Sequence, residues 1–226
     1  VATFSYTASP YCQNAVNPSP TFSGGGVAGT FSSTAGLVFV STATGQVNLS
    51  ASTPGTYTVT NTIAASGGCP AVTATASITI TAPQVATFSY TGTPYCQNAT
   101  NPSPTFSGGG VAGTFLSTAG LVFVSTSTGE VNLAASTAGT YTVTNTIAAS
   151  GGCPAVTATS TITINPVQSA AFNYASSTFC ATGTNPTPTI TGTPGGTFTS
   201  SPAGLVFVSS ATGEVDLAGS TLNTYS

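Results

Sequence analysis

The sequence of 226 residues contains no lysine, no arginine and no histidine, and its only acidic side chains are those of Glu130, Glu214 and Asp216. Ordinary domains are about one quarter charged, so this depletion is extreme. Without cationic side chains the protein cannot neutralise phosphates, so nucleic acids and anionic membrane surfaces are poor partners, and we expect it to bind no nucleic acid. Without histidine or lysine it also lacks the residues that most enzymes use as a general base or as a covalent amine. We therefore expect a protein that is not an enzyme and that needs no cofactor.

The sequence also lacks a membrane-spanning segment and a leader. No apolar run approaches the ~20 residues of a transmembrane helix, so we expect no membrane insertion. Val1 is not followed by a signal-peptide pattern, so we expect the chain to begin after processing or inside a longer polypeptide. The formal net charge of −3 leaves little electrostatic repulsion, which favours self-association or contact with neighbouring copies.

What the sequence does contain is alternation of apolar and hydroxyl side chains, most clearly in residues 55–80. The alternation covers residues 56–63 and 72–80, with Gly67 and Gly68 between the two runs. A period of two residues is typical of a strand and a Gly-Gly break of a tight turn, so this stretch predicts a β-hairpin. Its core-facing side would consist of Tyr57, Val59, Ile63, Val72, Ala74, Ala76, Ile78 and Ile80. Its other side would be a hydroxyl array of Thr56, Thr58, Thr60, Thr62, Thr73, Thr75, Ser77 and Thr79.

The chain repeats itself at intervals of about 84 residues, as tandem small domains do. Cys12, Cys96 and Cys180 recur at this spacing, and each lies near the start of its repeat. The hairpin pattern recurs at residues 139–164, and a third copy would begin at Asn223, just before the last residue given. We therefore predict three Ig-like repeats, at residues 1–84, 85–168 and 169–226, the third without its C-terminal hairpin.

A complete repeat consists of about seven short alternating runs separated by Gly, Pro and Asn turns, and no stretch of the chain has a helical period. This pattern predicts an all-β fold, with tandem antiparallel Ig-like β-sandwich domains. The chain contains no tryptophan, so the prediction concerns the sandwich architecture and not the strand order of antibody domains. The linkers at residues 81–84 and 165–168 each contain a proline and no glycine, so we expect the domains to form a semi-rigid rod.

Residues 36–49, followed by residues 54–59, resemble the signature GL-x-F-x-x-x-TG-x-I … AGTYTVTV of bacterial Ig-like, PKD-like and cadherin-like surface repeats. The whole unit also resembles the YCQN … NPTPT … GTYTVT … GGCPA repeats of very large secreted proteins of Bacteroidota. Those proteins include gliding-motility adhesins and other proteins exported by type IX secretion. The resemblance implies an extracellular, cell-surface location and tandem Ig-like domains, and it implies no particular ligand. Such proteins usually carry a C-terminal sorting domain, which this sequence lacks, so we expect it to be part of a longer chain.

Five cysteines without histidine or a C-x-x-C motif do not suit a zinc site, so disulfides are the natural interpretation. We expect one disulfide within each repeat, Cys12–Cys69 and Cys96–Cys153, with the partner of Cys180 beyond residue 226. An alternative links neighbouring repeats through Cys69–Cys96 and Cys153–Cys180. Extended strands of ~3.3 Å per residue would hold these cysteines tens of ångströms apart, whereas a disulfide needs Cα atoms within about 7 Å. Disulfides of either kind imply an oxidising, extracellular setting.

The three acidic residues are the remaining candidates for a metal site. Glu130 and Glu214 occupy one position of the repeat and Asp216 another, and the first repeat has amides at both positions, Gln46 and Asn48. Glu214 and Asp216 would face the same side of a strand and could form a weak calcium pair, but no calcium-binding loop surrounds them. We therefore expect solvated side chains and no metal.

Three other patterns have simple structural interpretations. The glycine runs at residues 24–26 and 108–110 precede no helix and no Lys-Ser/Thr pair, so they predict bends between strands and not phosphate loops. Two glycosylation sequons, at Asn48 and Asn98, fall at different repeat positions, which favours coincidence. The hydroxyl array suits a solvent-facing sheet, and the alternatives are a glycan-binding, ice-binding or lateral contact surface.

These observations together predict a structural repeat segment of a long extracellular bacterial filament or surface stalk, without catalytic activity. The alternative is an adhesin whose repeats bind a glycan or another surface ligand directly.

Overall fold

The computed structural model describes all residues from Val1 to Ser226 and contains strands but no helix, so the predicted all-β fold is confirmed. The chain forms two compact units, Val1–Asn165 and Pro166–Ser226, which we call unit 1 and unit 2. Unit 1 contains the first two repeats, each with a hydrophobic core of its own. The exact repeat boundaries at residues 84/85 and 168/169 stay a prediction.

Repeat 1 has eight strands: β1 (Phe4–Ser5), β2 (Tyr11–Cys12), β3 (Thr21–Phe22), β4 (Thr30–Ser33), β5 (Phe39–Ser41), β6 (Gln46–Val47), β7 (Gly55–Ile63) and β8 (Val72–Thr81). Repeat 2 has the matching set: β9 (Phe88–Ser89), β10 (Tyr95–Cys96), β11 (Thr105–Phe106), β12 (Thr114–Ser117), β13 (Phe123–Ser125), β14 (Glu130–Val131), β15 (Gly139–Ile147) and β16 (Val156–Asn165). Unit 2 has four: β17 (Phe172–Asn173), β18 (Thr189–Ile190), β19 (Val206–Ser209) and β20 (Glu214–Asp216).

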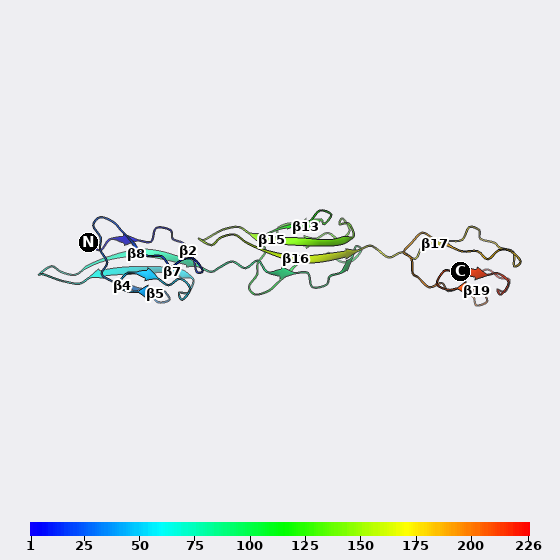
Figure 1. Ribbon diagram of the computed structural model, residues 1–226, viewed down its shortest axis with the longest axis horizontal. Helices are drawn as coiled ribbons and strands as arrows, with labels where there is room; N and C mark the ends of the chain where they lie inside the picture. Colours follow the sequence, from blue (N-terminus) through cyan, green and yellow to red (C-terminus); the bar gives the residue numbers. More distant parts are fainter. The chain divides into compact units, whose positions relative to one another are not determined.

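Each repeat of unit 1 is a sandwich of one four-stranded sheet and two strand pairs. In repeat 1 the sheet order is β2-β8-β7-β4, and the pairs are β1-β3 and β5-β6. The long strands β7 and β8 form the expected hairpin, with β4 beside β7 (Figure 1). Val59 and Ile78 of the hairpin are completely buried together with Phe31 of β4 and Val47 of β6. Apolar side chains from both layers therefore meet in one core, which is the main source of stability of such a sandwich.

Near the base of the hairpin, the alternation of apolar and hydroxyl side chains separates a buried face from an exposed face, as predicted. Tyr57 and Ile80 are buried, whereas Thr56 lies exposed on the other face and shares a hydrogen bond of 2.9 Å with Thr79 across the strands. The prediction is wrong for Val72, which is 44% exposed. The far end of the hairpin, residues 64–73, lies entirely exposed, so alternation there no longer separates an inside from an outside.

The strand β2 was not expected. Tyr11 and Cys12 belong to a segment that the sequence predicts as a connection, yet they pair in parallel with Ile80 and Thr81 at the end of β8. The sheet is therefore mixed and not purely antiparallel as predicted. This pairing places Cys12 beside the base of the hairpin, at the opposite end of β8 from the hairpin turn.

A buried asparagine holds the two layers together. Asn61 lies on the core-facing side of β7 with no exposed surface. Its Nδ2 donates to the carbonyl oxygens of Ala2 (3.0 Å) and Val27 (2.9 Å), and its Oδ1 accepts from the amide of Gly29 at 2.8 Å. Asn145 makes the same three bonds in repeat 2. A buried amide with all these bonds satisfied fixes one packing arrangement of loop and sheet.

A tyrosine at the start of β7 anchors the preceding turn. The hydroxyl of Tyr57 donates to the carbonyl oxygen of Thr53 at 2.7 Å, and Tyr141 donates to Thr137 at 2.8 Å in repeat 2. A tyrosine that bonds to the backbone a few residues upstream is a known feature of Ig-like sandwiches.

Candidate functional site

The candidate site is the junction of the two repeats of unit 1, formed by the tip of one hairpin and the base of another. The β15–β16 hairpin turns at Gly151 and Gly152, with φ values of 57° and 76°. Ser150 and Cys153 flank this turn and exchange backbone hydrogen bonds of 3.1 and 2.9 Å. Two successive residues at positive φ describe a two-residue turn that glycine adopts without a steric penalty. The turn thus presents the Cys153 side chain at the end of a long, narrow hairpin.

Backbone and small side chains of repeat 1 form the surface that receives this tip. The hydroxyl of Thr81, at the end of β8, donates to the carbonyl oxygen of Gly151. In the linker that follows, Gln84 Nε2 donates to the hydroxyl of Ser150 at 2.8 Å. A Cβ atom at Gly152 would overlap the carbonyl oxygen of Pro10. The absence of a side chain at this position is therefore a condition for the close approach of the two repeats.

A disulfide closes the junction. Cys153 at the tip is bonded to Cys12 of β2, with Cα atoms 4.6 Å apart and a sequence separation of 141. Both cysteines are buried, at 4% and 1% exposure. Since Cys12 belongs to repeat 1 and Cys153 to repeat 2, the bond joins consecutive repeats covalently.

The predicted pairing within repeats, Cys12–Cys69 and Cys96–Cys153, is therefore wrong. Cys12 lies at the base of its hairpin and Cys69 at the tip, with the ten residues of β8 between them. At ~3.3 Å per residue the strand separates the two by roughly 33 Å, far beyond the reach of a disulfide. The alternative Cys69–Cys96 and Cys153–Cys180 pairing is not formed either. The tip-to-base geometry depends on two features that the sequence pattern does not indicate, a strand at Cys12 and a contact of Cys153 with repeat 1.

The three other cysteines, Cys69, Cys96 and Cys180, are thiols in this structure. Cys69 occupies the tip position of repeat 1, and Cys96 occupies the base position of repeat 2 on the parallel strand β10. Cys180 is exposed in unit 2, and a partner beyond residue 226 stays a prediction.

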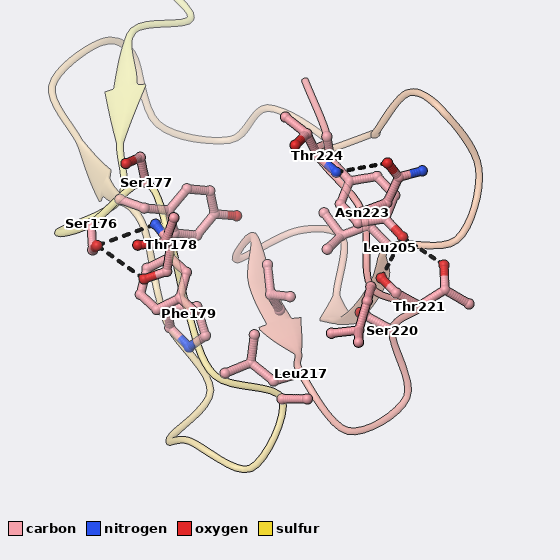
Figure 2. Close-up of a pocket in the computed structure, with 16 residues that line it drawn as sticks. Ser176, Ser177, Thr178, Phe179, Leu205, Leu217, Ser220, Thr221, Asn223 and Thr224 are labelled. Carbon is pink, nitrogen blue, oxygen red and sulfur yellow. Dashed lines mark hydrogen bonds between the residues drawn. The ribbon is translucent and has the colours of Figure 1, made fainter.

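Unit 2 contains an open cavity of about 470 Å³ where repeats 1 and 2 have a packed core. Figure 2 shows Phe179 on one side of it and Leu205 and Leu217 on the other. Two of the lining positions correspond, in the repeat, to the core residues Leu37 and Leu49. Phe172 in this unit is 47% exposed, whereas its counterpart Phe4 is 5% exposed. The cavity is thus the core face of a sandwich without a counterpart of the β7–β8 hairpin over it. Its lining consists of apolar and hydroxyl side chains and the amide of Asn223, and contains no charged residue.

The acidic residues do not gather into a site. No group of three or more His, Cys, Asp or Glu side chains lies close enough together to hold a metal ion. Asp216 Oδ1 accepts a hydrogen bond from the amide of Gly219 at 3.0 Å. Asn132 does the same for Ala135, at 3.1 Å. A role in a local turn explains why an acid and an amide can occupy the same repeat position.

The glycine runs are turns, as predicted. Gly24 and Gly25 have φ values of 58° and 74°, and the amide of Gly26 donates to the carbonyl oxygen of Ser23 at 2.9 Å.

The structure contains no helix that is long and apolar enough to cross a membrane.

No protein-family model and no curated protein sequence matches this chain. Among solved structures, it is similar to human CDH23 EC21-23, with 13% identity, a TM-score of 0.42, and coverage of 94% of this chain and 90% of that one. It is similar to Drosophila N-cadherin EC1-4 with 11% identity and a TM-score of 0.35, covering 72% of this chain and 49% of that one, so it spans about half the length of that protein. A third is BT4661, a SusE-like surface located polysaccharide binding protein of Bacteroides thetaiotaomicron, with 17% identity, a TM-score of 0.26, and coverage of 76% and 35%. At these values the likenesses support no conclusion about ligand or role.

Proposed function

We propose that this protein is a structural, non-catalytic segment of a long extracellular filament or surface stalk. The observation that carries the proposal is the Cys12–Cys153 disulfide, which joins successive repeats and not the two layers of one repeat. A bond within a repeat would stabilise that repeat alone. A bond between repeats also resists their separation under tension, which is the load that a stalk must bear.

The junction also supports an extracellular location. Disulfides persist in oxidising compartments and are reduced in the cytosol. Closing a loop of 141 residues stabilises the folded state by about 5 kcal/mol on the entropic model. Two small repeats without any salt bridge between side chains gain much from such a bond, because domains of this size bury a limited fraction of their surface.

The exposed surface suits packing against neighbouring copies of the filament. Its hydrogen-bonding groups are mainly hydroxyls, such as the paired Thr56 and Thr79 and their counterparts Thr140 and Thr163. A surface without cations and with three acidic residues offers no electrostatic barrier to lateral contact.

The test is immunogold labelling of intact producing cells with antibodies raised against the purified 226-residue protein. We expect labels at repeated positions along surface fibres. Label confined to the cell interior would refute the proposal. A glycan array probed with the same protein addresses the adhesin alternative, since specific binding there would show that the repeats themselves recognise a ligand.

A further inference from the structure

The two hairpin tips of unit 1 are identical in sequence and conformation but differ in their surroundings. Residues 66–70 and 150–154 both read Ser-Gly-Gly-Cys-Pro. Gly67 and Gly68 have φ values of 57° and 81°, and Ser66 and Cys69 form the same two-residue turn as Ser150 and Cys153.

The tip of repeat 2 is seated and the tip of repeat 1 is not. Cys153 is buried and bonded, whereas Cys69 is an exposed thiol. A Cβ atom at Gly68 would meet nothing within 4 Å, whereas one at Gly152 would overlap the backbone of Pro10. The bonded tip of repeat 2 thus shows, independently of repeat 1's tip, that this Ser-Gly-Gly-Cys-Pro loop binds the base of the preceding repeat.

Repeat 1 also shares the other features of repeat 2, whose tip is seated. The repeat that docks on repeat 1 begins with VATFSY at Val85, directly after the linker residues 81–84, and repeat 1 begins with the same VATFSY at Val1. Within repeat 2, the hairpin that carries the tip pairs over nine positions, from Gly139↔Ile164 to Ile147↔Val156, as it does in repeat 1. The distance from the start of the repeat to the tip is therefore the same in both.

We propose that Cys69 is the tip half of a second junction of this kind. Its partner is the base cysteine of a further repeat of the same type, joined to the N-terminal side of Val1. This inference rests on the proposed function, because a stalk of tandem repeats supplies that further repeat. Each repeat would then be bonded to the one before it, and the disulfides would form a ladder along the filament.

The bond requires an oxidant, for which glutathione disulfide or a similar small disulfide suffices. The Cys69 thiolate attacks one glutathione sulfur, forms a mixed disulfide and releases one glutathione. The thiolate of the base cysteine then attacks the Cys69 sulfur and releases the second glutathione. One disulfide breaks, one forms, and the two thiol protons end on two glutathione molecules.

The experiment compares the 226-residue protein with an extended protein that carries a second copy of residues 1–84 before Val1, with Cys69→Ser in the added copy so that only the Cys69 of repeat 1 can be alkylated or bonded. That copy supplies the observed receiving surface and the observed linker. Both proteins are folded in a glutathione redox buffer, treated with an alkylating reagent and mapped as peptides without reduction. We expect alkylation of Cys69 in the 226-residue protein. In the extended protein we expect its loss, and a peptide that joins Cys69 to Cys12 of the added repeat.

Two results would overturn the inference. One is an extended protein in which Cys69 stays alkylated although the Cys12–Cys153 bond has formed, which would show that the fold is intact and the tip unbound. The other is a dimer of the 226-residue protein linked through Cys69, which would make a second copy the partner. Neither result would remove the Cys12–Cys153 bond on which the proposed function stands.

A matched substitution controls for strain in the turn. Gly68→Ala and Gly152→Ala introduce the same methyl group at φ values of 81° and 76°, so their intrinsic backbone cost is alike. In the 226-residue protein only Gly152→Ala should slow disulfide formation, since only its Cβ meets Pro10. In the extended protein Gly68→Ala should slow formation of the Cys69 bond equally. A Gly68→Ala variant that forms the Cys69 bond at the unmodified rate would show that the tip is not seated as proposed.

Discussion

Opening the Cys12–Cys153 bond should greatly lengthen the protein under tension. When the chain is pulled from its two ends, force passes from Cys12 directly to Cys153 and bypasses everything between them. The two cysteines are 141 positions apart in sequence, yet their Cα atoms lie only 4.6 Å apart. Fully extended at ~3.6 Å per residue, the segment between them would contribute about 510 Å of contour length. The rest of the chain would contribute only about 310 Å on the same basis.

The measurement is single-molecule force extension with handles attached at Val1 and Ser226. We expect the oxidised protein to unfold to the shorter length and the protein treated with a phosphine reductant to gain the additional ~510 Å in contour length. The Cys12→Ser variant should behave like the reduced protein without any reductant, which separates the effect of this bond from other effects of reduction.

The pairing within repeats gives a different result. Cys12–Cys69 and Cys96–Cys153 would each hide about 200 Å, at ~3.6 Å per residue, so reduction would release two equal increments. An equal contour length before and after reduction, or two increments of about 200 Å, would refute the tip-to-base junction.

Three further predictions concern the fold. Asn61→Ala removes three hydrogen bonds and leaves the buried carbonyl oxygen of Ala2 without this partner, so we expect the free energy of unfolding in urea to fall by about 3 kcal/mol, against less than about 0.5 kcal/mol for the exposed Thr58→Ala. Burial, and secondarily the neighbouring Tyr11, raises the pKa of Tyr6, whose hydroxyl donates to the carbonyl oxygen of Gly45 at 2.5 Å. The folded state keeps this proton above pH ~10, where the unfolded chain releases it, so stability is full below pH ~10 and declines above it; Tyr6→Phe should flatten the decline in a pH series of thermal melts. Adding the sequence of residues 59–81 after Ser226 supplies a hairpin for unit 2, so binding of a hydrophobic dye to the open core face should decrease, and unchanged dye binding would contradict this account of the cavity.

The sequence determined the local structure of this protein. Alternation along residues 55–80 is enough to predict a hairpin, because side chains on successive strand residues point to opposite faces whatever the rest of the chain does. Gly67 and Gly68 were identifiable as the turn for the same local reason, since only glycine adopts two successive positive φ values without cost. The lack of an electrostatic barrier to self-association likewise follows from the composition alone, because the chain has no cationic side chain and only three acidic ones.

The tertiary structure decided what these elements contact. Asn61 interrupts an apolar alternation and gave no sign that it would bond to three loop groups of the sandwich, because its partners lie 32 to 59 residues away. The same is true of the disulfide. Cysteines at regular spacing allow pairing within or between repeats, and the choice depends on β2, two residues that pair in parallel with the end of β8. That pairing carries Cys12 away from its own hairpin tip and toward the tip of the next repeat, a spatial relation between distant segments that the order of residues along the chain does not contain.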